Sequence, residues 1–243
     1  MPMQPMPTGT GSVTWVGPED PAYAASGLIH NVRLPEAAGP SRPAPAVVMV
    51  HGWGGDESVM WIFKQAAPAG VALITPRAPL DLGEEGYAWF RHNGPKTRPE
   101  PASLTAGIAH LHRFLTSLPE LYPIDPARLV LIGFSQGAMV SNGLVLTHPN
   151  RVIGMASLAG SFPEVPEAMP EADLLAGFPV FIAHGTRDEI VPLSAARQTR
   201  EAYTWLGAEI TYGEYAVGHK MNVQAIKDLK AWLAKVIIGP SPH

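Results

Sequence analysis

The 243-residue chain has no cysteine, and charged residues make up only 16% of it. Without cysteine, disulfide frameworks, thiol catalysis and cysteine-ligated zinc or iron–sulfur sites are excluded. The net charge is −4, which is far from the basic profile of a protein that binds nucleic acid by neutralising phosphates. We therefore expect no nucleic-acid partner.

Long apolar runs are also missing. No uncharged apolar stretch approaches the ~20 residues that a membrane-spanning helix needs, so we expect no integral membrane segment. Residues 1–12 have no basic residue and no continuous apolar run, unlike a secretory signal, and are predicted to form a flexible tail. Residues 13–243 are expected to form a single domain in the cytoplasm. The sequence leaves a homodimer open.

Apolar residues make up 46% of the chain, enough for one sizeable core. Short branched apolar runs bounded by turn residues predict strands, and longer stretches with helical spacing predict helices. The predicted strands are residues 28–34, 46–50, 71–75, 129–133, 152–158, 179–183 and 209–215, and the predicted helices are 102–118, 136–147, 194–206 and 223–236.

This alternation predicts an α/β fold with a mainly parallel central sheet of about seven strands and helices on both faces. The strand at 28–34 is expected at a sheet edge. Two long segments, 76–101 and 160–177, follow strands directly, so they are candidate walls of a site at the carboxyl ends of the strands. Neither is long enough to be a large cap domain.

A candidate nucleophile lies in Gly133-Phe134-Ser135-Gln136-Gly137, between a predicted strand and a predicted helix. This is the context that a G-x-S-x-G nucleophile elbow requires. We expect a side chain at position 133 or 137 to collide with packed backbone, and Ser135 to be held in a strained conformation. The alternative is a glycine-rich turn that serves packing alone.

A serine hydroxyl needs a base, and a histidine oriented by a carboxylate is the common solution. In this context the acid and then the histidine follow the serine, each in a loop after a later strand. Asp188 follows the predicted strand 179–183, and His219 follows 209–215. Glu189 and Asp173 remain alternatives for the acid.

His219 alone among the nine histidines has the right place and order. His51 and His184 each precede a glycine at a strand end, where a structural role is expected. His92, in an aromatic-rich segment, is a candidate to touch substrate. His110 and His112 lie two apart on a predicted helix, roughly 200° around its axis, so they do not chelate one metal ion.

An acyl-transfer site also needs donors for the oxyanion of the tetrahedral intermediate. The main-chain N–H of Gln136, directly after the serine, is the first expected donor, and Trp53 in the glycine-rich segment after strand 46–50 is the second. Four residues are further candidates for the substrate pocket: Tyr87, Trp89, Phe90 and Met139. A core role fits Trp89 and Met139 equally well.

From about residue 46 to residue 221 the chain resembles the phospholipase/carboxylesterase family of α/β-hydrolases, which includes carboxylesterases and acyl-protein thioesterases. The similar stretches are His51-Gly52-Trp53-Gly54, Trp89-Phe90, Ile124-Asp125-Pro126-Ala127-Arg128-Leu129, Gly133-Phe134-Ser135-Gln136-Gly137-Ala138, His184-Gly185 with Asp188 and Val191-Pro192, and Gly218-His219. Trp53 stands where the family commonly has a smaller aliphatic residue.

The resemblance implies a catalytic triad of Ser135, Asp188 and His219, with Trp53 and Gln136 as oxyanion donors. It also implies ester hydrolysis through an acyl-enzyme, without a metal or organic cofactor. We therefore predict a serine carboxylesterase acting on small-molecule esters. Short- to medium-chain acyl groups are expected, because the loop lengths indicate an open site without a large cap. An acyl thioesterase or lysophospholipase on the same triad is the alternative. A serine peptidase, or a non-catalytic binding protein with this fold, is less expected.

Overall fold

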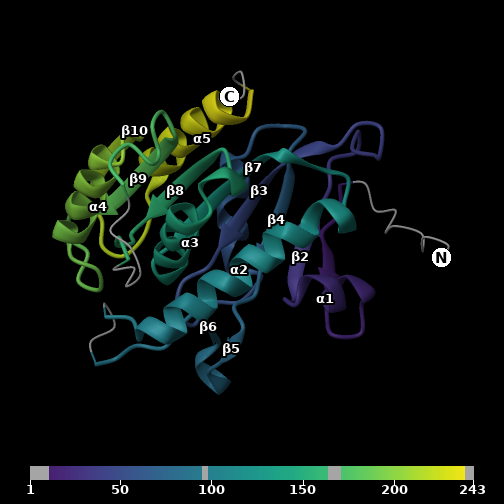
Figure 1. Ribbon diagram of the computed structural model, residues 1–243, viewed down its shortest axis with the longest axis horizontal. Coiled ribbons are helices and arrows are strands. Elements are labelled where there is room, and N and C mark those ends of the chain that lie inside the picture. The colour runs from purple at the N-terminus through teal and green to yellow at the C-terminus, as the bar shows by residue number, and fades with distance from the viewer. Residues whose placement is uncertain (1–10, 95–97, 164–170, 239–243) are drawn as a thin grey trace.

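The computed structural model describes residues 11–94, 98–163 and 171–238, and its centre is an eight-stranded sheet (Figure 1). The strand order is β1-β2-β4-β3-β7-β8-β9-β10. The strands are β1 (Thr14–Val16), β2 (His30–Arg33), β3 (Ala44–Val50), β4 (Ala72–Pro76), β7 (Ile124–Phe134), β8 (Gly154–Leu158), β9 (Pro179–Gly185) and β10 (Glu209–Tyr215). Pairing is parallel from β4 to β10 and antiparallel where β2 meets β1 and β4, so the predicted mainly parallel sheet is confirmed.

The sheet differs from the prediction at its amino-terminal edge. Strand β1 was not predicted, and it pairs with β2, so the predicted edge strand lies second from the edge. The predicted flexible tail falls mostly on residues 1–10, outside the described residues. Gly11, also assigned to that tail, donates a main-chain hydrogen bond to the carbonyl of Leu34 at 3.3 Å.

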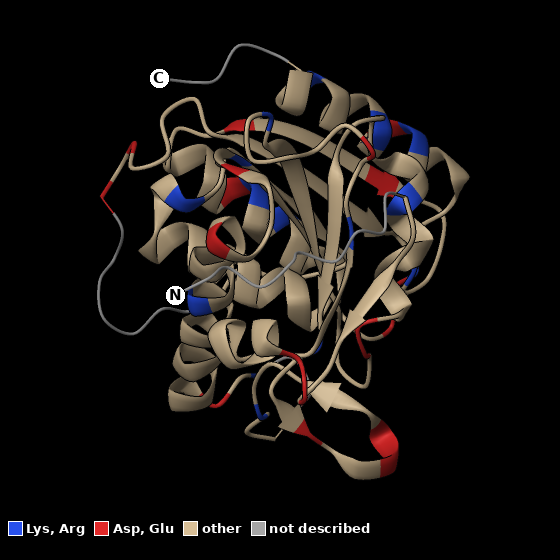
Figure 2. Ribbon diagram, turned by 90° about the vertical axis from the view of Figure 1, so that its right-hand side faces the viewer, with Lys and Arg blue, Asp and Glu red and all other residues tan. Residues whose placement is uncertain are grey.

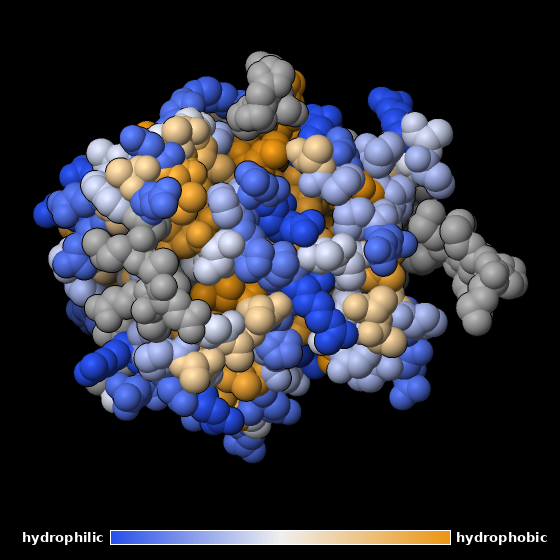
Figure 3. Space-filling view, viewed as in Figure 1, coloured by the Kyte–Doolittle hydropathy of each residue, from blue (hydrophilic) through white to orange (hydrophobic). Residues whose placement is uncertain are grey.

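The four predicted helices are present as α2 (Pro101–Leu121), α3 (Gln136–Thr147), α4 (Leu193–Trp205) and α5 (Val223–Ile238). A short helix α1 (Pro21–Ser26) and the 3₁₀ segments η1 (Val59–Ala66), η2 (Gly83–Glu85) and η3 (Pro149–Arg151) were not predicted. The apolar positions of α2 face the sheet, and its opposite face is exposed. In the space-filling view of this side, polar residues separate smaller apolar areas (Figure 3).

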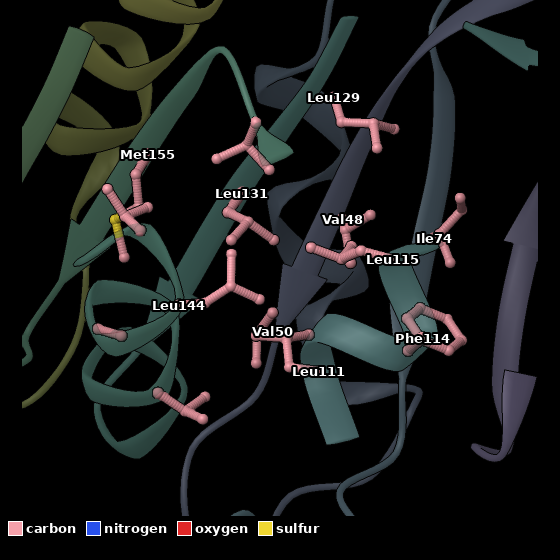
Figure 4. Packing of buried hydrophobic residues seen from close by; sticks show 14 of the residues in the cluster. Val48, Val50, Ile74, Leu111, Phe114, Leu115, Leu129, Leu131, Leu144 and Met155 are labelled. Atoms are coloured by element: carbon pink, nitrogen blue, oxygen red, sulfur yellow. The ribbon is translucent and has the colours of Figure 1, made fainter. Parts of the chain in front are cut away.

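The strands are buried on both faces. In β3, Val48 and Val50 pack in the cluster that also contains the apolar faces of α2, α3 and α4. The alternate residues Val47 and Met49 pack in a second cluster, with η1 and α5. Figure 4 shows the first cluster, where side chains of α2 and α3 meet those of the sheet. Because side chains alternate across a strand, these two clusters explain the nearly continuous apolar sequence of the strands.

The segment between β4 and α2 contains a two-stranded hairpin, β5 (Leu80–Asp81) and β6 (Tyr87–Ala88). Two acidic residues, Glu84 and Glu85, lie in η2 between these strands. Figure 2 shows this hairpin projecting from the lower edge of the molecule with acidic residues near its tip. After the hairpin, Trp89 and Phe90 are buried in the core.

Candidate active site

Ser135 stands between the end of β7 and the first residue of α3, as the elbow motif predicts. Its backbone has φ 55° and ψ −117°, a region that non-glycine residues seldom adopt. The main-chain N–H of Ser135 donates to the carbonyl of Leu158 at 2.8 Å, which ties the turn to the neighbouring strand β8. The predicted strained serine is confirmed.

The flanking glycines are required by close backbone approach. A Cβ at Gly133 would lie 2.5 Å from the carbonyl oxygen of Gly137. A Cβ at Gly137 would lie 2.2 Å from the carbonyl oxygen of Val50, at the end of the central strand β3. Both distances are too short for a carbon atom beside a carbonyl oxygen, so the predicted collision at positions 133 and 137 is confirmed.

His219 lies in the loop between β10 and α5 and reaches both other predicted triad residues. Its Nε2 is 2.9 Å from Oγ of Ser135, and its Nδ1 is 2.7 Å from Oδ2 of Asp188. These partners assign the proton of the neutral ring to Nδ1, which donates to the carboxylate. Nε2 then accepts from the serine hydroxyl. The carboxylate side chain is fully buried, whereas the imidazole is 21% exposed.

The carboxylate of Asp188 is held by its own loop. Oδ1 accepts main-chain hydrogen bonds from Ile190 and Val191, each at 2.9 Å, so Oδ2 is directed at His219. The two alternatives for the acid lie elsewhere. Glu189 is exposed, and Asp173 lies beside the carboxyl end of α4, where its N–H donates to the carbonyl of Trp205.

The acid loop and the histidine loop are joined by their backbones. The N–H of Thr186 donates to the carbonyl of Tyr215 at 2.7 Å, and that of Arg187 donates to the carbonyl of Val217 at 3.0 Å. Gly185 permits this approach, because a Cβ there would lie 2.2 Å from the carbonyl oxygen of Gly218. The distance between Asp188 and His219 is therefore set by main-chain contacts.

His184 lies next to the carboxylate of Asp188. It is fully buried, with Nε2 2.9 Å from the carbonyl of Val191 and 3.4 Å from Oδ2 of Asp188. Burial lowers its pKa, against opposing contributions from the Val191 carbonyl and the Asp188 charge, so the ring is neutral near pH 7. Nε2–H then donates to Val191, which is a structural contact.

His51 has an equally structural role at the end of β3. Its Nε2 accepts the main-chain N–H of Ala78 at 2.9 Å, and its Nδ1 donates to the carbonyl of Gly52 at 2.7 Å. Burial lowers the pKa of His51 to about 4, so the ring stays neutral. The carbonyl of His51 also accepts from the indole N–H of Trp89 at 2.9 Å.

The two predicted oxyanion donors flank the serine. A Cβ at Gly52 would lie 3.1 Å from Cβ of Ser135, so the loop that carries Trp53 lies against the elbow. Gln136 is the first residue of α3, where a main-chain N–H has no intrahelical acceptor. The side chain of Gln136 instead binds the segment that carries Trp89 and Phe90. Its Oε1 accepts from the N–H of Trp89 at 2.7 Å, and its Nε2 donates to the carbonyl of Phe90 at 2.8 Å.

Ser135 borders two cavities of very different size. The larger has a volume of about 560 Å³ and lies between the Gly52–Gly55 loop, η1 and the residues after His219. The smaller has a volume of about 40 Å³ and lies on the side of Gln136. Trp53 and Ile190 line both cavities.

Of the predicted pocket residues, Phe90 and Met139 line the smaller cavity, together with His92. Tyr87 and Trp89 line neither cavity, so the structure corrects their assignment. Trp89 is 1% exposed and bonded through its indole, and it belongs to the core instead. Tyr87 lies under the guanidinium of Arg77, whose carbon is 4.5 Å from the ring centre.

The wall of the larger cavity was missed by sequence reasoning. Part of it is formed by η1, which contributes Val59, Met60, Ile62 and Phe63. Residues 59–63 are all apolar, so the sequence shows no period there that could have identified the wall.

The sheet is mainly parallel, a strained serine follows β7, and a histidine–carboxylate pair lies at the same rim. Together these features define an α/β-hydrolase. The model of the Phospholipase/Carboxylesterase family matches residues 36–237. The chain belongs to this family, whose members are hydrolases of esters or thioesters.

Individual relatives agree with this membership. Acyl-protein thioesterase 1 of Debaryomyces hansenii is 28% identical over 233 residues, covering 87% of this chain and 99% of the relative. Acyl-protein thioesterase 1 of Emericella nidulans is 33% identical over 220 residues, covering 79% of this chain and 90% of the relative. The Bacillus cereus carboxylesterase has the same fold, with a TM-score of 0.77 and 21% identity over 88% of this chain and 97% of that one.

Among the described residues, no helix combines the length and apolar character needed to cross a membrane.

Proposed function

We propose that this protein is a serine carboxylesterase that hydrolyses carboxylic esters of short to medium acyl chain length through an acyl-enzyme. The observation that carries the proposal is the continuous set of contacts from Ser135 Oγ to His219 to Asp188, at 2.9 and 2.7 Å. A neutral imidazole with its proton on Nδ1 is positioned to accept the serine proton on Nε2.

In the first half-reaction Oγ of Ser135 bonds to the ester carbonyl carbon while its proton moves to Nε2 of His219. The negative charge on the carbonyl oxygen is stabilised by the main-chain N–H groups of Trp53 and Gln136. The carbon–oxygen bond to the alcohol then breaks, and the proton on Nε2 passes to the leaving oxygen. In the second half-reaction water gives a proton to Nε2 and bonds to the acyl carbon. The bond from that carbon to Oγ then breaks, Oγ takes the proton from Nε2, and the acid is released.

The hydrolysis of p-nitrophenyl butyrate by the wild type and by Ser135→Ala tests this proposal. We expect the wild type to turn the ester over and the variant to lose nearly all activity with little change in Tm. Equal activity of the two proteins would contradict the assignment. Loss of activity together with a large fall in Tm would show that position 135 matters for folding rather than for chemistry.

Thioester hydrolysis is the second candidate, because the curated relatives cited above are named acyl-protein thioesterases. The same attack and proton transfers apply, with sulfur as the leaving atom. Parallel assays with butyryl-CoA and p-nitrophenyl butyrate separate the two activities. A non-catalytic binding protein predicts turnover of neither substrate.

We further propose that residues 13–243 form one domain, because strands from β1 to β10 share one sheet. The cytoplasmic location and the homodimer stay predictions.

A further inference from the structure

The two cavities at Ser135 differ about fourteenfold in volume, at about 560 and about 40 Å³. The acyl chain and the alcohol of an ester extend from the carbonyl carbon in different directions. Small-molecule sites commonly have volumes of about 300–1,000 Å³, a range that includes only the larger of the two cavities. The substrate class therefore depends on which part of the ester enters which cavity.

His219 distinguishes the two sides. Its imidazole lines the larger cavity and is absent from the lining of the smaller one, whereas Ser135 lines both. Under the proposed function, Nε2 of His219 returns its proton to the leaving oxygen, so the leaving oxygen must be within hydrogen-bond reach of that nitrogen. The alcohol therefore enters the larger cavity, and the acyl chain is directed to the side of Gln136.

The larger cavity suits an apolar alcohol. Its lining includes Met60 and Phe63 of η1, Phe134 beside the serine, and Met221 after the histidine. The ring centres of Phe134 and His219 are 5.1 Å apart, so an aromatic surface continues from the base into the cavity. Burial of an apolar alcohol against these side chains is favourable because it removes apolar surface from water.

The smaller cavity is narrow and bounded by packed side chains. The ring of His92 lies between Trp53 and Phe90, with ring centres 4.8 and 5.5 Å away. On the other side, Met139, Ser161 and Val191 line both this cavity and a third cavity of about 630 Å³, so they form the boundary between the two. A volume of about 40 Å³ has room for only about one or two water-sized groups, which limits the acyl side to a short chain.

We infer that the preferred substrates are esters of a short acyl group, such as acetyl, with a large apolar alcohol. The inference rests on the proposed esterase function and narrows it. It assigns size selection on the acyl side to Trp53, His92 and Met139, and binding of the alcohol to the surface formed by η1, Phe134 and Met221.

The test compares two isomers with the same molecular formula and similar intrinsic reactivity. Octyl acetate has a two-carbon acyl group and an eight-carbon alcohol, and ethyl octanoate reverses this arrangement. With kcat/KM measured by pH-stat titration, we expect octyl acetate to exceed ethyl octanoate by about tenfold or more, since a few methylene groups in a matched or closed pocket have effects of this size. A ratio of one, or a preference for ethyl octanoate, overturns the inference.

Two variants test the two cavities separately. Met139→Ala opens the smaller cavity toward the third one, so the octyl acetate to ethyl octanoate ratio should fall by about fivefold or more through a gain on ethyl octanoate. Val59→Trp fills the larger cavity, so the ratio should fall through a loss on octyl acetate. Ile238→Trp is the matched control, because Ile238 is 71% exposed at the end of α5 and lines none of the three cavities. A ratio that is unchanged in both cavity variants contradicts the assignment of the two sides.

Failure of the inference and failure of the proposed function are distinguishable. If p-nitrophenyl acetate is hydrolysed in a Ser135-dependent way but the isomer ratio is one or lower, only the size inference fails. If neither isomer nor p-nitrophenyl acetate is hydrolysed, the esterase function itself fails and the inference falls with it.

Discussion

Nδ1 of His219 and Oδ2 of Asp188 lie 2.7 Å apart, and this contact fixes the ring tautomer. Asp188→Asn keeps an oxygen that can accept from Ile190 and Val191 but presents an amide to His219. The amide donates to Nδ1, so the proton of the ring moves to Nε2, which can no longer accept from serine. We expect kcat to fall by about ten-thousandfold with a small change in Tm.

The matched control for this variant is the neighbouring carboxylate. Glu189 is exposed, so Glu189→Gln should leave kcat and Tm near wild-type values. A large loss in Glu189→Gln with normal activity in Asp188→Asn would assign the acid to Glu189 instead.

The close packing of the strand-to-helix turn at Ser135 predicts that a side chain at position 137 lowers the stability of the protein. Gly137→Ala places a methyl group 2.2 Å from the carbonyl oxygen of Val50, so β3 and α3 must separate or the chain must unfold. We expect a loss of about 3 kcal/mol or more in the free energy of unfolding, measured by urea titration. Gly39→Ala is the control, because a Cβ at Gly39 meets nothing within 4 Å. Equal stabilities of the two variants would contradict the close packing of the elbow.

Because the ring of His51 is buried, we predict that the free energy of unfolding depends on pH in the acid range. Its pKa is about 4 in the folded protein and 6.5 as an ordinary histidine. Between these values the unfolded chain binds a proton that the folded protein does not, so the free energy of unfolding falls as the pH is lowered from about 6.5 to about 4. The pKa difference corresponds to about 3 kcal/mol, since each tenfold change in proton binding is worth about 1.4 kcal/mol.

Urea titrations of the wild type and His51→Gln over this pH range measure that contribution. The variant is expected to be less stable at pH 7 and to lose less stability on acidification. His30 and His184 also have lowered pKa values through burial, so part of the acid sensitivity should remain in the variant. Identical pH dependences of the two proteins would contradict a neutral, buried His51.

An ion pair anchors the segment that leads from the predicted oxyanion loop into η1. The carboxylate of Glu57 accepts from Arg77 at 2.6 and 2.7 Å and from the indole of Trp15 at 2.9 Å. Burial alone would raise the pKa of Glu57, but these hydrogen bonds lower it overall. Glu57→Met should cost about 2 kcal/mol of unfolding free energy, less than a fully buried pair because Arg77 is 21% exposed.

The double variant Glu57→Met/Arg77→Met provides the comparison. Removal of both charges leaves no unpaired guanidinium, so the double variant should be more stable than Glu57→Met alone in the same urea titration. A double variant that is less stable than the single one would contradict the pairing.

Seven of the eight strands of the main sheet, the four long helices and the positions of Ser135, Asp188 and His219 could be predicted because each depends on a local pattern. Strong alternation of apolar strands and helices gives a parallel sheet, and the ends of such strands meet at one rim. Strand β1 could not be predicted, since its three residues are too few to show a period and its pairing with β2 is a long-range contact.

The pocket was the least predictable part. Aromatic residues at 87, 89 and 90 suggest a wall, but which of them face the cavity depends on tertiary hydrogen bonds. The indole of Trp89 lies in the core, where its N–H donates to the carbonyl of His51. The cavity wall comes instead from η1, whose role depends on the packing of Phe63 and Met60 against the far face of the sheet.

The most direct test of the central claim is covalent labelling with a fluorophosphonate, which reacts preferentially with an activated serine. After incubation and proteolysis, mass spectrometry should find a single phosphonate adduct on Ser135 in the wild type. Labelling should be abolished in Ser135→Ala and strongly slowed in His219→Ala. No adduct on Ser135 in folded protein, or labelling at an equal rate in His219→Ala, would contradict the account.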